Sequence, residues 1–177
     1  MKLCIFCSAN EHLDPAFFAM TKELGEWAGR NGHDIVFGGT NMGLMECVAR
    51  SARQAGARII GVTPTLVEQR GRVSDCCDVT VPCSNLHERK ALMEEQGDVF
   101  IALPGGIGTL DEVFTVAASA TIGYHQKRVI LYNMKGFWDS LIHLMDDLQE
   151  RGVIRGSWRS YVQVAGTLEE LQRLIAG

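Results

Sequence analysis

The sequence predicts an α/β protein with a Rossmann-like three-layer fold, in which helices cover both faces of a mostly parallel central sheet. Short apolar runs typical of strands alternate with longer segments in which apolar residues recur every three or four positions, as in helices. This alternation favours parallel strands joined by right-handed crossovers. The run VFIAL, from Val99 to Leu103, is apolar throughout, which is typical of a central strand buried on both faces.

The two kinds of segment divide nearly the whole chain. The runs predicted as strands are Lys2 to Cys7, Asp34 to Phe37, Arg58 to Val62, Asp78 to Val81, Val99 to Leu103 and Arg128 to Tyr132. The segments predicted as helices are Ala16 to Gly29, Leu44 to Gln54, Leu86 to Glu95, Leu110 to Ala120, Phe137 to Glu150 and, at the end, Thr167 to Ala176. The least regular stretch runs from Pro64 to Asp75.

Length and composition limit the possible classes of protein. A chain of 177 residues that is 46% hydrophobic has the size of one domain, and we expect residues 1–177 to form a single nucleotide-binding domain. With 17 basic and 21 acidic residues interspersed, it has no basic stripe that would bind nucleic acid. No apolar run reaches the roughly 18 residues of a membrane-spanning helix, and the N-terminal apolar run is shorter than a signal-peptide core. We therefore expect a cytoplasmic protein without a nucleic-acid or membrane partner.

The six cysteines do not predict a metal site or a disulfide. Cys4 and Cys7 lie in one predicted strand at an odd spacing, so their side chains should face opposite ways. Cys76 and Cys77 are adjacent. We interpret the cysteines as reduced, small core residues, and since no histidines have a metal-binding spacing either, no metal is expected.

The strongest functional signal is the segment PGGIGTLDE, residues 104–112, which directly follows the predicted central strand. Glycines at a turn from strand to helix let backbone N–H groups approach an anion, and the helix start adds partial positive charge. Gly105, Gly106 and Gly108 fit neither the dinucleotide fingerprint nor a Walker loop. A phosphate-bearing ligand is the natural guest of this turn. A second glycine loop, residues 38–43, follows another strand, so we expect the two glycine turns to converge on one edge of the sheet.

An alternative interpretation of this segment is purely structural. Thr109 and Glu112 have the spacing of a capping box, in which Ser or Thr and a Glu three residues later close a helix start. Thr167 and Glu170 have the same spacing without nearby glycines. Spacing alone therefore does not assign a catalytic role to Glu112.

Two basic residues lie near the start of the preceding predicted helix, in NLHERKALMEE. Arg89 and Lys90 would meet the positive end of the helix dipole there, at a cost of about 0.3–1 kcal/mol each, which a bound anion would reverse. Alternatively, they pair with Glu94 and Glu88 or are solvated. Because this helix leads into the strand before PGGIGTLDE, we expect Arg89 to face Glu112 across one ligand.

HERKALME followed by PGGIGTLDE resembles the Lonely Guy family, the cytokinin riboside 5'-monophosphate phosphoribohydrolases, some of which carried the label lysine decarboxylase-like. The resemblance extends along the chain, through CIFCSAN, GGTNMGLM, IIGVTP and IGYHQKRVILYN. It implies a Rossmann-like fold, a homodimer, a nucleoside 5'-monophosphate substrate and no cofactor. It also implies that Arg89 and Glu112, which match the arginine of HxRK and the glutamate of PGGxGTxxE, are the catalytic pair.

These roles suit the chemistry of glycosidic cleavage, in which a carboxylate stabilises an oxocarbenium-like state and activates water. We assign that role to Glu112, with Arg89 orienting the nucleotide. The residues expected to bind the substrate are Ser8, Gly39, Lys90, Gly105, Gly106, Ile107, Gly108 and Thr109. The chain departs from the family at Thr40 and Glu46, where glycines are common, at Cys7 to Asn10 in place of a C-G-S-S turn, and at Ser119 and Thr121, in place of a tryptophan and a glutamine.

Two other functions remain open from the sequence. A nucleotide- or cofactor-binding module with the same loops would bind a ligand without turnover. A pyridoxal phosphate-dependent decarboxylase would need a Schiff-base lysine, and none of the five lysines lies in a setting that argues for one.

Overall fold

The computed structural model describes residues 1–177 and is built around a parallel seven-stranded sheet with strand order β4-β3-β2-β1-β5-β6-β7. The strands are β1 (Lys2–Phe6), β2 (Asp34–Phe37), β3 (Ile59–Pro64), β4 (Val79–Cys83), β5 (Val99–Ala102), β6 (Val129–Tyr132) and β7 (Val162–Ala165). The predicted α/β class with a parallel sheet is confirmed.

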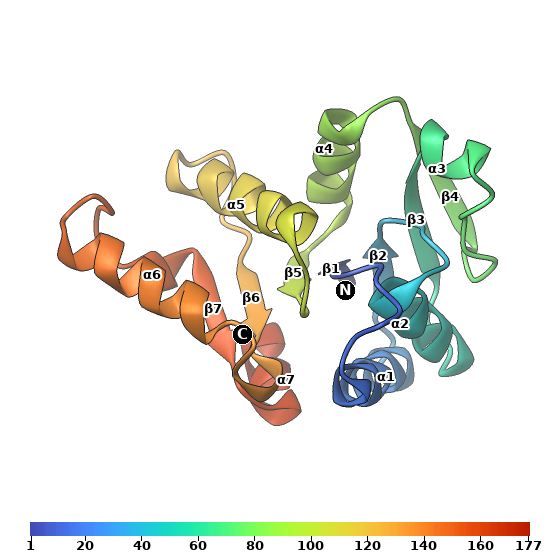
Figure 1. Ribbon diagram of the computed structural model, residues 1–177, viewed down its shortest axis with the longest axis horizontal. Coiled ribbons are helices and arrows are strands. Elements are labelled where there is room, and N and C mark those ends of the chain that lie inside the picture. Colours follow the sequence, from blue (N-terminus) through green and yellow to red (C-terminus); the bar gives the residue numbers. More distant parts are fainter.

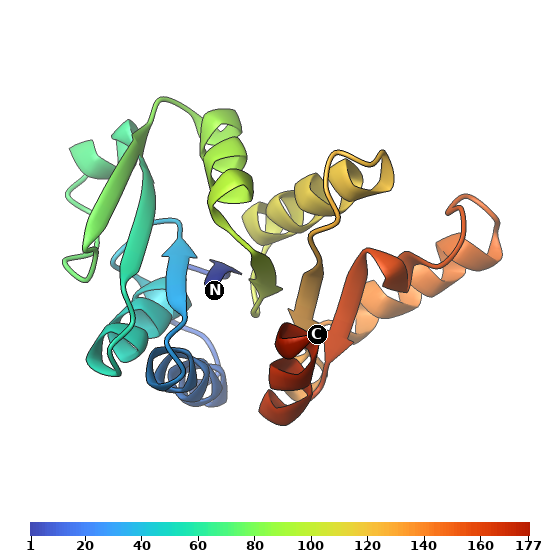
Figure 2. The ribbon, with the colours of Figure 1, turned by 180° about the vertical axis from the view of Figure 1, so that it is seen from behind.

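Helices cover both faces of this sheet (Figure 1). The helices are α1 (Pro15–Arg30), α2 (Gly43–Gln54), α3 (Thr65–Gln69), α4 (Leu86–Gln96), α5 (Ile107–Thr121), α6 (Asp139–Glu150) and α7 (Leu168–Ala176), with short 3-10 turns at Met134–Gly136 and Trp158–Ser160. Helices α1, α2 and α7 pack on one core cluster, and α4, α5 and α6 contribute to the other. The view from behind shows the same two groups (Figure 2).

Successive strand residues supply the two core clusters alternately, because side chains along a strand point to opposite faces. On β1, Leu3 and Ile5 belong to the cluster under α1 and α2, whereas Cys4 and Phe6 belong to the cluster under α4 and α5. Cys7 joins the first cluster, so Cys4 and Cys7 do face opposite sides of the sheet as expected.

The predicted elements are all present, with shifted ends, but some short elements were not predicted. Strand β7 has only four residues and pairs only with β6, at the edge of the sheet, so its apolar pattern is short. Helix α3 is five residues long, buries none of them, and falls within the stretch identified as least regular. No helix of the protein is long and apolar enough to cross a membrane.

The order of the strands creates a crevice at the end of β1. From β1 the chain adds β2, β3 and β4 on one side, and then returns to place β5 on the other side of β1. Ligands of open parallel sheets bind at such a switch point, outside the carboxyl ends of the strands. Here those ends lead into Cys7–Ser8 after β1 and into PGGIGTLDE after β5.

Helices α1 and α2 pack closely because glycines of α1 lie against small residues of α2. A Cβ atom built on Gly29 would lie 2.5 Å from the carbonyl oxygen of Ala52 and 2.6 Å from the Cβ atom of Ala55. The neighbouring atoms belong to backbone or to a short side chain, so they cannot rotate away. This contact holds α2, whose N-terminus borders the crevice, at a fixed distance from α1.

We predict that Gly29→Ala lowers the free energy of unfolding by about 1–2 kcal/mol. Overpacking costs about 1–3 kcal/mol, and three overlaps of 2.5 to 2.8 Å with atoms that cannot rotate away place Gly29 in the upper part of that range. The cost there exceeds the gain of about 1 kcal/mol from replacing a helical glycine by alanine. Denaturant unfolding measures the difference. Gly166→Ala is the control, because its Cβ would meet nothing closer than Glu170 Oε2 at 3.4 Å. A Gly29→Ala variant as stable as the wild type would contradict the proposed close contact.

Candidate active site

A cavity of about 270 Å³ lies at the switch point, between the loops after β1 and β5 and the start of α2. Ser8 joins these three segments. Its backbone N–H donates a hydrogen bond to the carbonyl oxygen of Pro104 at 3.0 Å, and its carbonyl oxygen accepts one from the N–H of Leu44 at 3.0 Å. The residues lining the cavity are Cys7, Ser8, Ala9, Met45, Arg89, Gly106, Gly108, Thr109 and Glu112.

Glu112 lies in the second turn of α5, with only 7% of its side chain exposed. Burial raises the pKa of this carboxyl from 4.5 to about 7, because desolvation disfavours the charged form. The positive charges of Arg89 and Lys90 lower this pKa and so oppose the effect of burial, whereas the negative charge of Asp111 raises the pKa further. A carboxyl with a pKa near neutral pH is suited to accept and return a proton at that pH.

Arg89 reaches the cavity from α4. Its Nη2 atom lies 3.7 Å from Oε1 of Glu112, an ion pair that is too long for a hydrogen bond. Its Nε atom is buried and has no hydrogen-bond partner. The guanidinium thus has donors to offer to a ligand, and its charge is balanced only in part by Glu112.

The loop from Gly105 to Gly108 leads into α5 without a side-chain cap. The helix begins at Ile107, and its N-cap residue Gly106 has no side chain to accept from the first N–H groups. Cβ atoms on Gly106 and Gly108 would meet nothing within 4 Å, so packing within the protein does not require glycine at either position. Their bare backbone leaves space at a helix N-terminus, where an anion is favoured.

The capping-box alternative for Thr109 and Glu112 is wrong. The helix begins two residues before Thr109, so that residue lies inside the first turn, buried and lining the cavity. At the last helix the same spacing does form a cap: Thr167 accepts a hydrogen bond from the N–H of Glu170 at 3.2 Å. Asn85 caps α4, because its side chain accepts hydrogen bonds from the N–H groups of His87 and Glu88.

The structure brings six of the predicted site residues together in the cavity lining: Ser8, Arg89, Gly106, Gly108, Thr109 and Glu112. Arg89 faces Glu112, as expected, and it does not pair with a glutamate of its own helix. The sequence did not single out Met45 as a ligand-contacting residue, and Cys7 and Ala9 appeared only as parts of a motif. Their position directly after β1, at the switch point, is the signal that could have identified them.

The other four predicted residues lie outside the lining. The Nζ atom of Lys90 binds Oδ1 of Asp111 at 2.7 Å, so it neither pairs with Glu88 or Glu94 nor points to the cavity. A Cβ atom on Gly105 would overlap the side chain of Thr109, so close packing within the protein accounts for a glycine at this position. Ile107 is 88% exposed. The remaining residue, Gly39, has a positive φ of 73° and accepts a hydrogen bond from the N–H of Ser74.

The lining limits the cofactors that this cavity could hold. No lysine is among its residues, so it offers no amine for a Schiff base with pyridoxal phosphate. No group of three or more His, Cys, Asp or Glu side chains in the protein is placed to hold a metal ion. The arrangement is a buried carboxylate and a guanidinium beside an uncapped helix N-terminus, at the switch point of a Rossmann-like fold.

Comparison with known proteins gives the family. The family model described as "Possible lysine decarboxylase" matches residues 45–175. The chain is 36% identical to the rice (Oryza sativa subsp. japonica) protein named "Probable cytokinin riboside 5'-monophosphate phosphoribohydrolase LOGL2", over 96% of this chain and 70% of that protein. It is 32% identical to the cytokinin riboside 5'-monophosphate phosphoribohydrolase LOG3 of Arabidopsis thaliana, over 96% and 79% of the two chains. The chain therefore belongs to the Lonely Guy family.

Among solved structures, the molybdenum cofactor binding protein of Rippkaea orientalis has a similar fold, with a TM-score of 0.74 and 23% identity over 99% of this chain and 94% of that one. At this level of identity the likeness concerns the fold alone.

The buried Glu112 should make stability depend on pH. Because its pKa in the folded protein, about 7, lies above the 4.5 of an unperturbed glutamate, the folded state holds more protons than the unfolded chain between these values. Stability should then fall by about 3 kcal/mol as the pH rises from 4.5 to 7. Glu112→Gln removes this loss, so we predict that the variant is more stable than the wild type at pH 8 and equally stable below pH 4.5.

Urea unfolding at several pH values measures this difference. Glu26→Gln, on the exposed side of α1, is the control and should change stability by no more than about 0.5 kcal/mol at any of them. A Glu112→Gln variant that is less stable than the wild type at pH 8 would refute the desolvation account.

Proposed function

We propose that the protein hydrolyses the N-glycosidic bond of a purine nucleoside 5'-monophosphate, of the adenine or cytokinin type, and releases the free base and ribose 5-phosphate. The observation that supports this most directly is that Glu112 and Arg89 line one cavity together with the uncapped N-terminus of α5. The names of the relatives support the same reaction.

In this proposal the phosphate binds at the start of α5, to backbone N–H groups near Gly106 and Gly108 and to the hydroxyl of Thr109. Glycine is useful there because a side chain would occupy the phosphate position. Arg89 adds a positively charged side chain to the partial positive charge of the helix start, and its unpartnered Nε atom gains a hydrogen-bond acceptor. The ribose then lies deeper in the cavity, with its C1' atom toward Glu112.

During the reaction the bond between C1' and N9 of the base breaks, and its electron pair leaves with the base, which takes up a proton at N9. The ionised carboxylate of Glu112 stabilises the positive charge that develops on the ribose ring. A water oxygen bonds to C1', and one of its protons passes to the carboxylate of Glu112. Glu112 then returns that proton to solvent, from which the departing base takes up its proton at N9, so the carboxylate is regenerated. The product is ribose 5-phosphate with a hydroxyl group on C1'.

The competing proposal is a binding module that holds a nucleotide or a cofactor without converting it. The fold it shares with a molybdenum cofactor binding protein is compatible with such a role. However, simple binding does not need a buried carboxylate, which repels an anionic ligand. The pair of Glu112 with Arg89 therefore favours hydrolysis.

We predict that the purified protein releases free base from AMP or from isopentenyladenosine 5'-monophosphate, and that Glu112→Gln lowers kcat/KM at least about 100-fold. Because Glu112 must be ionised, kcat/KM of the wild type should fall as the pH drops through about 7. Chromatography of base and ribose 5-phosphate measures both. Wild-type protein that binds these nucleotides without releasing base would support the binding module instead.

The same proposal includes a homodimer. The cavity, at about 270 Å³, is slightly smaller than ligand sites usually are, at about 300–1,000 Å³, so a nucleotide would extend beyond it. Beside it, the outer side of α5 exposes Ile107, Phe114 and Ile122, and Tyr124 is exposed just after the helix. These residues form an apolar surface that begins at Ile107, beside the cavity, and runs along α5 to its other end. In this proposal a second copy of the chain covers that surface and completes the site.

We predict that the wild type has the mass of a dimer in light scattering and that Phe114→Glu yields monomers, because a charge would be buried without a partner. Leu66→Glu is the matched control: it also introduces a charge at an exposed apolar residue, but on α3, beside the other half of the sheet. A monomeric wild type, or dimers of both variants alike, would contradict the assignment of this surface.

A further inference from the structure

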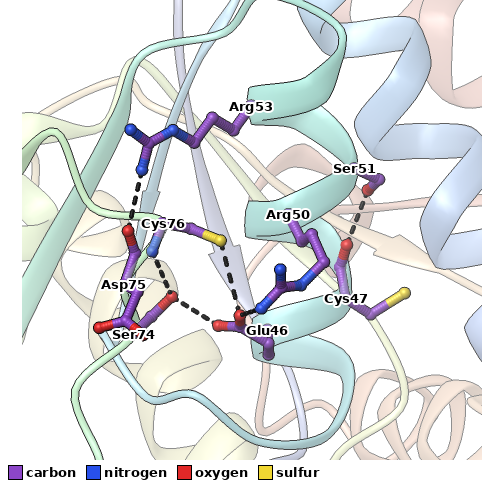
Figure 3. A network of polar contacts seen from close by, with 8 residues as sticks. All are labelled: Glu46, Cys47, Arg50, Ser51, Arg53, Ser74, Asp75 and Cys76. Atoms are coloured by element: carbon purple, nitrogen blue, oxygen red, sulfur yellow. Dashed lines mark hydrogen bonds and ion pairs between the residues drawn. The ribbon is translucent and has the colours of Figure 1, made fainter.

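A network of polar contacts at the start of α2 has no part in the site described above (Figure 3). Its centre is the carboxylate of Glu46, whose side chain is only 15% exposed. The Oε2 atom accepts a hydrogen bond from Oγ of Ser74 at 2.5 Å, and Oε1 accepts from Nη2 of Arg50 at 2.5 Å and from Sγ of Cys76 at 3.5 Å. Glu46 thus binds a segment that lies about 30 residues later in the chain to α2.

That segment is in turn paired with the second glycine loop. The N–H of Ser74 donates to the carbonyl oxygen of Gly39 at 2.8 Å, and the N–H of Asn41 donates to the carbonyl oxygen of Arg72 at 3.0 Å. Thr40 and Val73 form an antiparallel bridge between these two hydrogen bonds. The position of Gly39 therefore depends on the position of Ser74, which Glu46 holds through its hydroxyl.

The glycine loop forms the surface on which Arg89 rests. A Cβ atom on Gly38 would overlap Nη2 of Arg89 and would lie 3.2 Å from Cε of Met45, so the guanidinium occupies the space that a side chain at residue 38 would need. A movement of this loop would therefore change the position of the Arg89 guanidinium, which packs against Gly38. Glu46, Ser74, Gly39, Gly38 and Arg89 are therefore connected by consecutive contacts or bonds.

We propose that Glu46 is a positioning residue: through Ser74 and the Gly38–Gly39 loop it holds the guanidinium of Arg89 in place beside Glu112. Neither Glu46 nor Ser74 lines the cavity, so neither contacts a ligand there directly. Any effect of their hydrogen bond on the site must therefore pass through the glycine loop. The expected loss of turnover on breaking this link rests on the proposed function, whereas the expected displacement of the Arg89 guanidinium does not.

The titration of Glu112 in the free protein reports the position of Arg89. Because the charge of Arg89 lowers the pKa of Glu112, a displaced guanidinium should raise that pKa further. The titratable and charged groups that face Glu112 are Arg89 and Lys90 on α4, Asp111 on α5, Cys4 on β1 and Cys7 directly after it. Glu46 is not among them, so it can act on Glu112 only through another group.

The test compares Glu46→Ala and Ser74→Ala with the wild type by carbon NMR of labelled glutamate carboxyl groups, Glu112 being assigned from the spectrum of Glu112→Gln. We expect each variant to raise the pKa of Glu112 by about half a unit or more. The double variant should add little to either single change, because both break the same link. Base release should also fall about 10- to 100-fold, mainly in kcat.

Glu26→Ala is the matched control. Glu26 also accepts a hydrogen bond from an arginine one turn later on its helix, at 2.9 Å from Arg30, but both of its ion-pair partners, Lys22 and Arg30, lie on α1 itself. It should leave both readouts unchanged. If Glu46→Ala does not fold, Ser74→Ala, which removes only a hydroxyl, decides the question.

An unchanged titration of Glu112 in a folded Glu46→Ala or Ser74→Ala variant would overturn the positioning role, whatever the turnover. If the titration shifts as expected but the wild type releases no base, the positioning role stands and the proposed hydrolysis fails.

Discussion

The burial of one carboxylate beside one guanidinium is the constraint on which the rest of the site depends. Taking Glu112 out of water is unfavourable for its charged form, and the Nη2 atom of Arg89, 3.7 Å away, compensates only in part. A protein selected for stability alone would gain from a neutral residue at this position. The arrangement is therefore understood more readily as a site that is incomplete until a ligand with both anionic and developing cationic charge enters.

The fold supplies the two groups from different directions and fixes them with backbone contacts. Helix α5 follows β5 and carries Glu112 in its second turn, whereas Arg89 lies near the start of α4, the helix that precedes β5. Both helices cover the same face of the sheet. The opposite side of the cavity comes from the loop after β1 and from α2. In that loop, the backbone of Ser8 forms hydrogen bonds with Pro104 and with Leu44 at the start of α2. Four separate segments therefore converge where the strand order reverses.

Much of this arrangement could be predicted from the sequence, because it follows from periodicity and from chain order. Alternating strands and helices predicted the parallel sheet. The helix that carries Arg89 directly precedes the strand that leads into PGGIGTLDE, and this chain order predicted that Arg89 faces Glu112. Contacts between side chains could not be predicted in the same way. Lys90 finds Asp111 on the neighbouring helix, and Glu46 finds Ser74 in an irregular stretch, and neither pairing has a signal in local spacing.

The start of α5 shows a different limit. A helix that begins at Ile107 with glycines on both sides and no side-chain cap goes against local preference, so the sequence pattern placed its start later, at Leu110. Such conflicts between local preference and structure are expected where a ligand completes the site. The uncapped, glycine-flanked start that misled the prediction of the helix is the feature to which we assign the phosphate of the substrate.

The central claim is that a nucleotide phosphate takes the place of that missing cap while its ribose faces Glu112. A crystal structure of the Glu112→Gln variant with AMP tests this most directly, because the variant should bind the nucleotide without cleaving it. The account predicts phosphate oxygens within hydrogen-bond distance of N–H groups in the first turn of α5, and C1' as the ribose atom nearest to residue 112. A phosphate bound away from α5, or a ribose turned away from residue 112, would contradict it.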